Sequence, residues 1–131
     1  MTELEKTEKI TINLGPVDLG QIDLLIQEGF YSNRTDFIRT AVRIQIATHA
    51  EVIKHTITRK TLVLGVQHYT RQDLEAVRAT GETLQINVLG LVSIAEDVSP
   101  ELALATISVI EVLGAFRAST AVKAALAGRI R

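Results

Sequence analysis

Within residues 8–14, close to the N-terminus, polar and apolar residues alternate from Lys9 to Leu14. Such a two-residue period is typical of a β-strand that buries one of its faces. The buried face would carry Ile10, Ile12 and Leu14, and the opposite face would carry Lys9, Thr11 and Asn13. The residues that follow read as helix, so the chain offers no neighbouring strand. We therefore expect the same strand of a second copy to pair antiparallel with this one and to share its apolar face.

Two helices are predicted after this strand. The first is expected over residues 17–28, because the fixed φ of Pro16 suits a helix start and Gly29 follows where a left-handed residue is needed. Ser32 is the expected N-cap of the second helix. No glycine or proline interrupts the pattern from there to Ile53. We therefore expect one continuous helix that frays over residues 54–58.

The apolar residues of the second helix complete the predicted dimer. Their spacing places them on one helical face, where they can meet the apolar face of the strand. The expected dimer core consists of Ile10, Ile12, Leu14, Phe37, Ile38 and Val42. Arg39 and Arg43 are four residues apart, so they share a solvated stripe of the same helix.

An internal repeat occupies the second half of the chain. The triplet Val-Leu-Gly recurs at residues 63–65, 88–90 and 112–114, at spacings of 25 and 24 residues. Each triplet is followed by a helix start, at Thr70, Ser99 and Ser119. Strand, glycine, turn and capped helix thus form one unit that recurs three times. Such a repeat predicts a small solenoid whose strands stack in parallel, similar to short leucine-rich strand-helix solenoids.

The N-terminal segments Lys9–Leu14 and Gly29–Arg43 together resemble the CopG/Arc-type ribbon-helix-helix repressors and plasmid-encoded antitoxins. The resemblance implies that the two-stranded ribbon enters the major groove of DNA and that its outward residues read base edges. By position, these readers would be Lys9, Thr11 and Asn13. Their chemistry fits, because lysine donates to guanine, asparagine pairs with adenine through its amide, and the threonine methyl group contacts thymine.

The start of the second helix is the candidate phosphate site. Amides at a helix start are not bonded within the helix, and the helix dipole adds positive potential there. The residues concerned are Ser32, Asn33, Arg34 and Thr35. Contacts of this kind would hold the ribbon in register on the DNA backbone without reading sequence.

Composition and charge narrow the picture further. The chain is 47% hydrophobic and 22% charged, which is typical of a globular protein, and it has no cysteine and hence no disulfide framework. No targeting or membrane-spanning segment is recognisable, so we expect a cytoplasmic, nucleoid-associated protein. Residues 1–58 carry six basic and eight acidic groups. With so little positive charge, we expect modest affinity for double-stranded DNA per dimer and steep salt sensitivity.

The sequence suggests neither a catalytic nor a metal site. Nickel-responsive ribbon-helix-helix repressors have a similar length, but this chain has no cysteine and only His49, His55 and His68, without a closely spaced pair in its second half. Capping explains the hydroxyl residues Thr70, Ser99 and Ser119 without a catalytic role. We therefore expect no enzyme activity, no cofactor and no small-molecule ligand.

These observations predict a mixed α/β chain with two domains. Residues 1–58 would form a ribbon-helix-helix domain for DNA binding and dimerisation, and residues 59–131 a three-repeat module that joins dimers into higher-order homo-oligomers. The predicted function is sequence-specific, repressor-like regulation of transcription. Two alternatives stay open. One is a self-assembling scaffold that uses the ribbon only to dimerise, and the other is the antitoxin of a toxin–antitoxin pair.

Overall fold

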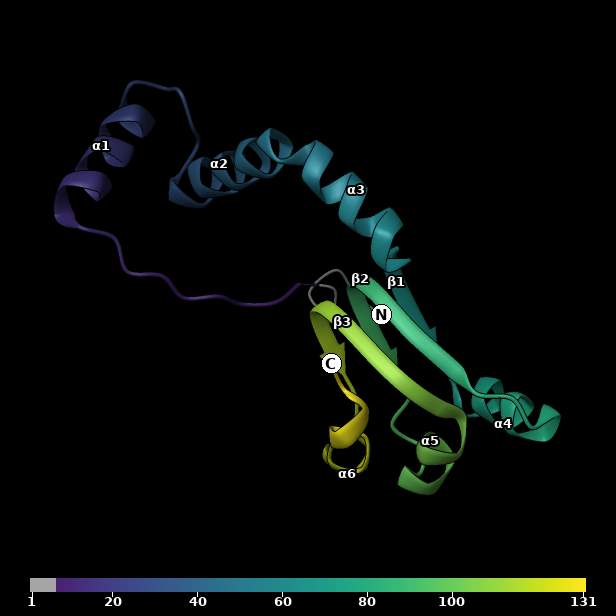
Figure 1. Ribbon diagram of the computed structural model, residues 1–131. Helices are drawn as coiled ribbons and strands as arrows, with labels where there is room; N and C mark the ends of the chain where they lie inside the picture. The colour runs from purple at the N-terminus through teal and green to yellow at the C-terminus, as the bar shows by residue number, and fades with distance from the viewer. Residues whose placement is uncertain (1–6) are drawn as a thin grey trace. The chain divides into compact units, whose positions relative to one another are not determined.

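The structure is a computed structural model that describes residues 7–131, and the chain divides into two compact units, residues 7–55 and 56–131. The first contains α1 (Pro16–Gln27) and α2 (Arg34–Thr48), and α3 (Ala50–Lys60) leads into the second (Figure 1). The second unit contains all three strands. In the described part of the chain, no helix is long and apolar enough to cross a membrane.

The predicted N-terminal strand is not formed within the single chain. Residues 8–14 run as an extended segment in which every residue is exposed, and they belong to no strand ladder (Figure 1). This outcome has a simple physical reason. An extended segment becomes a β-strand only when its amide and carbonyl groups meet those of a neighbouring strand, and no such segment lies nearby in the sequence.

The first helical turn of α2 differs from the prediction. The N-cap is Asn33 rather than Ser32, because the Asn33 side-chain oxygen accepts a hydrogen bond of 2.8 Å from the Asp36 amide. The amide of Ser32 instead donates to the Asp36 carboxylate at 2.9 Å. The boundaries of α1 agree with the predicted 17–28 to within one residue at each end: Pro16 lies in its first turn, and Gly29 follows its C-cap with the left-handed φ of +88°.

The predicted continuous helix is interrupted at His49, which separates α2 from α3. Here the Thr48 hydroxyl donates to the Ile44 carbonyl at 3.0 Å, and the His49 amide bonds to Ile46. A threonine that bonds back to the carbonyl four residues earlier competes with the regular helical ladder. The helix then resumes and extends to Lys60, so the predicted fraying over residues 54–58 was wrong.

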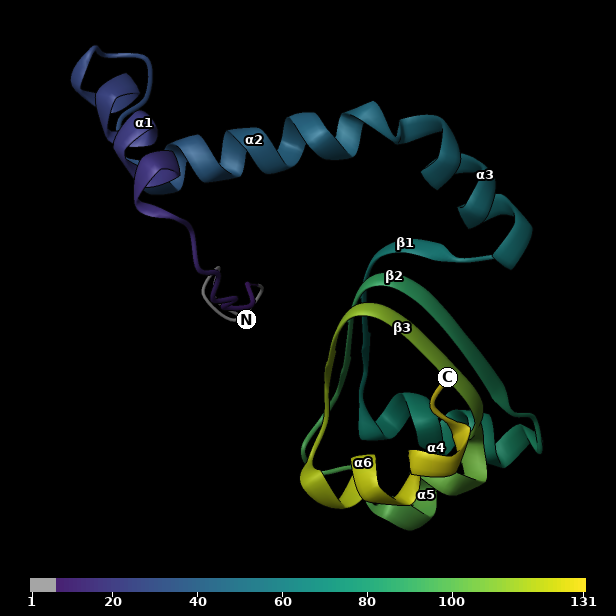
Figure 2. The same cartoon turned by 60° about the vertical axis from the view of Figure 1, so that its left-hand side comes forward.

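The repeat in the second unit forms an open, three-stranded parallel sheet in the order β1 (Val63–Tyr69), β2 (Leu84–Ile94) and β3 (Ile107–Arg117). The three Val-Leu-Gly triplets lie in register across it. The helices that follow the strands are α4 (Arg71–Thr80), α5 (Pro100–Thr106) and α6 (Thr120–Ala125), and a short η2 (Ala127–Arg129) comes last. The helices α4, α5 and α6 lie within the bend of the sheet (Figure 2).

All three caps predicted for the second unit are confirmed. Thr70 and Asp73 form a reciprocal capping box at the start of α4, while the hydroxyls of Ser99 and Ser119 accept the amides of Leu102 and Val122. Hydrogen bonds from Thr70 hold the pKa of the Asp73 carboxyl below its usual value. The carboxyl is therefore ionised at neutral pH, and the capping box is complete there.

The glycines of the triplets do not end their strands, as the repeat had suggested, but lie within them. Gly65, Gly90 and Gly114 have φ values of +140°, +143° and +123°. L-residues with a side chain rarely adopt this conformation. Each strand bends in its middle part, and the three bends coincide (Figure 2). The aligned glycines therefore account for the bend of the sheet over the helices.

The core of the second unit lies between the sheet and these helices. Its buried residues are Leu74, Ile86, Val88, Val92, Ile94, Val98, Leu102, Ala103, Ile107, Ile110, Val122 and Leu126. At the outer edge of β3, Ile130 forms an isolated parallel bridge with Ile110. The Arg129 guanidinium donates to the Leu104 and Ile107 carbonyls at 2.5 and 2.7 Å, which satisfies acceptors at the end of α5. Residues 129–131 thus partly cover one edge of the sheet, whereas the outer edge of β1 has no neighbouring strand among the described residues.

Candidate nucleic-acid interface

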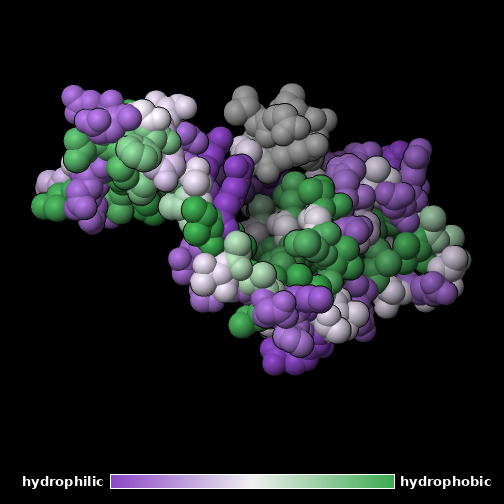
Figure 3. All heavy atoms as spheres, turned by 90° about the horizontal axis from the view of Figure 1, so that it is seen from above, coloured by the Kyte–Doolittle hydropathy of each residue, from purple (hydrophilic) through white to green (hydrophobic). Residues whose placement is uncertain are grey.

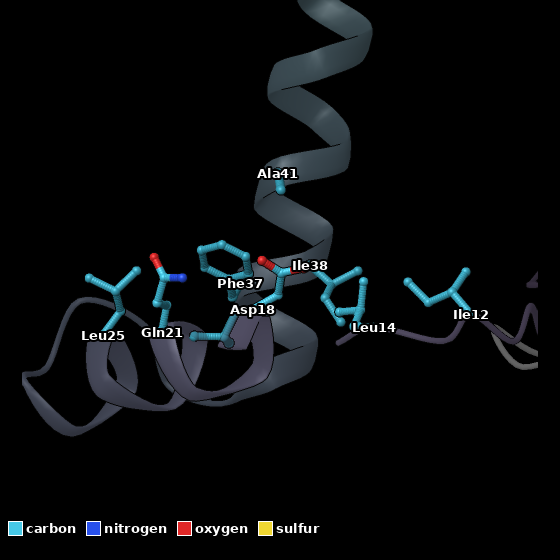
Figure 4. Close-up of a pocket in the computed structure, with 9 residues that line it drawn as sticks. Ile12, Leu14, Asp18, Gln21, Leu25, Phe37, Ile38 and Ala41 are labelled. Atoms are coloured by element: carbon cyan, nitrogen blue, oxygen red, sulfur yellow. The ribbon is translucent and has the colours of Figure 1, made fainter. Parts of the chain in front are cut away.

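The unit of residues 7–55 has almost no interior of its own. Ile22 is its single buried residue in the described structure. An open apolar groove of about 430 Å³ runs between the extended segment, α1 and α2, and Figure 4 shows Ile12, Leu14, Phe37 and Ile38 along it. The residues that line the groove are Ile12, Leu14, Asp18, Gln21, Ile22, Leu25, Phe37, Ile38 and Ala41. A helical unit with so little buried surface is not stable without further contacts.

The predicted dimer-core residues lie at or beside this groove. Ile10 and Ile12 are 79% and 56% exposed, and Leu14 and Val42 are also exposed. Phe37 and Ile38 are half-buried, and the Phe37 ring meets Tyr31 edge to face at 5.0 Å between centroids. Large apolar side chains that are exposed together mark a surface for another protein chain.

The predicted base readers, Lys9, Thr11 and Asn13, are all exposed on the extended segment. Alternation along extended backbone directs them away from the side that carries Ile10, Ile12 and Leu14. One side of the segment is therefore apolar, and the other presents an amine, a hydroxyl and an amide.

Arg34 has a partner that the sequence did not suggest. Its guanidinium donates two hydrogen bonds to the Asp23 carboxylate of α1, Nε to Oδ1 at 2.9 Å and Nη2 to Oδ2 at 2.8 Å. These hydrogen bonds, with the charge of Arg34, hold the pKa of the Asp23 carboxyl below its usual value. The bidentate pair joins α1 to the start of α2, and it neutralises Arg34 locally.

Three other cations gather beside the extended segment. Lys9, Arg39 and Arg43 line one hollow, together with Thr7, Glu8, Ile10, Thr35, Ile38 and Val42. The four-residue spacing of the arginines had indicated a shared stripe of the helix, but not its proximity to Lys9. Three cations face one carboxylate, Glu8, in this hollow, whereas Arg34 is paired one to one with Asp23.

The remaining predicted phosphate residues surround the start of α2. Ser32, Asn33 and Thr35 are exposed there, but Asp36 lies within the same turn and its carboxylate takes the Ser32 amide. This carboxylate reduces the positive potential of the helix start. The amides of Arg34 and Thr35 also lie in this first turn, and the cap formed by Asn33 bonds to neither of them.

Histidine and carboxylate side chains do not form a metal site within residues 7–131, where no group of three or more such residues lies close enough to hold an ion. Nε2 of His49 lies 3.4 Å from Nε2 of Gln45, and His68 is hydrogen-bonded to Ser93. His55 lies six residues from His49 on exposed helix. The three histidines therefore lie at separate places.

Comparison with known proteins gives one result. The model of the Ribbon-Helix-Helix transcriptional regulator family matches residues 5–123, which spans both units, and no separate family of leucine-rich solenoids is found for the second. No curated protein and no solved structure matches the chain. The family's name describes a ribbon and two helices, and in this chain the extended residues 8–14 are followed by α1 and α2. The chain belongs to the Ribbon-Helix-Helix transcriptional regulator family, which is non-enzymatic and acts in transcription regulation by binding DNA, typically as a dimer.

Proposed function

We propose that this protein is a sequence-specific, repressor-like regulator in which two copies pair their N-terminal segments and place the resulting ribbon in the major groove. The observation that carries the proposal is the incomplete interior of residues 7–55, where Ile22 alone is buried. A second copy supplies what is missing. Its Ile10, Ile12 and Leu14 would lie against the groove that Phe37 and Ile38 line.

Antiparallel pairing also solves the problem of the unpaired backbone. The exposed amides and carbonyls of residues 8–14 would form a ladder with those of the partner copy. With the apolar side facing the shared core, Lys9, Thr11 and Asn13 of both copies face outward in a row. A two-stranded ribbon of this kind fits the major groove, where each base pair presents a distinct pattern of donors and acceptors.

Contacts with the DNA backbone come from two places in this arrangement. Lys9, Arg39 and Arg43 share one hollow and supply charge that attracts phosphate. The start of α2, with Ser32, Asn33, Arg34 and Thr35, supplies amides and polar side chains. Asp36 and Asp23 oppose the one cation there, whereas the hollow has three cations and one acid, Glu8, so we assign the larger electrostatic share to the hollow.

The second unit, in this proposal, joins dimers to one another. This joining role is supported by the exposed apolar surface of the sheet, where Leu64 is 71% exposed and Val66 and Leu113 are also exposed. The space-filling view shows hydrophobic side chains gathered over the unit that carries the sheet (Figure 3). The outer edge of β1 adds backbone groups that a further strand could meet. Linked dimers raise the effective concentration on tandem operators, which compensates for modest charge.

The function is tested by a salt titration of binding to the DNA upstream of the protein's own gene. We expect tighter binding to this DNA than to a shuffled duplex, and affinity that falls steeply as salt rises. Absence of binding even at low salt would instead favour the scaffold, in which the ribbon serves only for dimerisation.

In the same titration, Arg34→Ala should weaken binding to all sequences alike. The salt slope should flatten by about one unit if the guanidinium meets one phosphate. Asp23→Asn is the matched variant, because it frees Arg34 from its bidentate partner and should tighten binding. If neither variant changes the slope, Arg34 serves only to join α1 to α2.

Assembly beyond the dimer is tested by sedimentation of the full chain. Leu64→Lys with Val66→Lys should reduce the largest species to a dimer, because two ammonium groups on the apolar face oppose burial. Gln72→Lys, on the exposed surface of α4, adds charge elsewhere and should leave the mass unchanged. A wild-type chain that stays a dimer at high concentration would refute the assembly role.

A further inference from the structure

A row of polar residues crosses the sheet near the carboxyl ends of its strands. His68 pairs in register with Ser93, and Ser93 with Arg117. The three residues occupy equivalent positions of the repeat. On the same face, the residues two positions earlier are Val66, Leu91 and Ala115, all without polar side-chain atoms. On this face of the sheet, the side chains therefore change at this row from apolar to hydrogen-bonding and charged.

The row forms part of a hollow of about 500 Å³. Its lining residues are His68, Ser93, Ile94, Ala95, Glu96, Arg117, Ala118 and Lys123. This volume lies within the range of small-molecule sites in proteins. The position is also informative, because ligands of open parallel α/β sheets bind beyond the carboxyl ends of the strands.

Two of the polar side chains are held in place. Ser93 is only 7% exposed, and its Oγ lies 3.1 Å from His68 Nδ1. Lys123 Nζ of α6 lies 5.8 Å from the centroid of the Phe116 ring, a cation–π distance that keeps the ammonium near the end of β3. Arg117 is half-buried in the same hollow. Side chains from all three strands and from α6 therefore converge.

The charges of this hollow favour an anion. The lining contains two basic side chains, Arg117 and Lys123, and one carboxylate, Glu96. The Asp73 carboxylate lies near His68, but it is bonded to Thr70 in the capping box. A guanidinium with its parallel donors suits carboxylate or phosphate oxygens, and the serine–histidine pair adds polar groups beside it.

We propose that this hollow binds a small anion, carrying a carboxylate or a phosphate group, as an effector of the regulator. Arg117 and Lys123 neutralise the ligand, and the Ser93–His68 pair provides polar contacts beside it. The site lies wholly in the unit of residues 56–131. Its occupancy is measured without DNA, so its failure is distinct from failure of the DNA-binding proposal.

The test is calorimetric titration of the full-length protein with inorganic phosphate and, separately, with succinate, at constant ionic strength set with chloride. We expect saturable binding of at least one probe with a Kd of about 1 mM or tighter. Lys123→Gln should weaken this binding about tenfold, the loss expected for one charged hydrogen bond. Lys123 is exposed, so this variant leaves the fold intact.

Arg117→Gln provides the second variant, and Arg78→Gln the control, because Arg78 is an exposed cation of α4 outside the hollow. Arg117 makes further contacts within the protein, so the thermal unfolding of the Arg117→Gln variant is measured beside the titration. Equal Kd values for wild type and Lys123→Gln, or no saturable binding of either probe, would overturn the proposal. The proposal is also overturned if the Lys123→Gln variant binds the anion as wild type does and only its DNA binding depends less steeply on salt. The hollow would then contact the DNA backbone.

Discussion

The double variant Lys9→Ala/Asn13→Ala is expected to abolish sequence preference. Each base-edge contact contributes about 1–3 kcal/mol of discrimination, and a dimer carries both residues twice. The ratio of specific to non-specific affinity should therefore fall at least about a hundredfold. Binding to a shuffled duplex should weaken far less, because Arg39 and Arg43 still attract phosphate. The measurement is a competition titration of operator against shuffled DNA.

A matched control removes the same kinds of groups from the other unit. Gln72→Ala/Arg78→Ala deletes one amide and one cation from the exposed surface of α4 and should leave the affinity ratio unchanged. Dimerisation should survive in both double variants, because Ile10, Ile12 and Leu14 are retained. If Lys9→Ala/Asn13→Ala kept its preference for the operator while remaining dimeric, base reading would have to be assigned elsewhere.

Alanine at Gly90 or Gly114 is expected to prevent the sheet from forming in its observed geometry. A Cβ at Gly90 would overlap the carbonyl oxygen of Gly65, and a Cβ at Gly114 would overlap that of Gly90. These atoms are backbone and cannot turn aside, so the strands must separate. The strained φ adds about 1–3 kcal/mol to this steric cost. The total is a large fraction of the stability of a small domain, and we expect loss of cooperative thermal unfolding for this unit.

Gly65→Ala is the internal control for this prediction. Gly65 has the same kind of φ, at +140°, but a Cβ there would meet nothing within 4 Å, because β1 is the edge strand. Its cost should be the conformational strain alone, about 1–3 kcal/mol. The comparison is made by thermal and chemical unfolding of the full chain. Equal losses for the three variants would mean that φ, and not the close approach of the strands, decides the effect.

Local patterns explain why much of the second unit was predictable. Each cap, at Thr70, Ser99 and Ser119, depends on hydrogen bonds to amides only three residues away. The repeat likewise predicted parallel strands with aligned triplets, because identical units stack in the same orientation. Strand length was not predictable in this way. The glycines read as ends of strands, whereas pairing with neighbours carries the strands through them.

The N-terminal unit was less predictable where two nearby patterns compete. Ser32 and Asn33 are both good N-caps, and only the backbone path decides which side chain reaches the Asp36 amide. The break at His49 depends on the rotamer of Thr48, whose hydroxyl bonds to Ile44. No glycine or proline lies at this break, so the residue types there did not predict it.

Taken alone, the sequence determined most of the helical segments, where most of these helices begin, and that residues 8–14 have one apolar and one polar side. These properties follow from periodicity and from contacts within a few residues. Tertiary structure alone decided the Asp23–Arg34 pair, the hollow of Lys9 with Arg39 and Arg43, and the hollow that Glu96 and Lys123 share. Each of these joins residues that are far apart in the chain. Their proximity depends on how helices and strands pack, which no local pattern encodes.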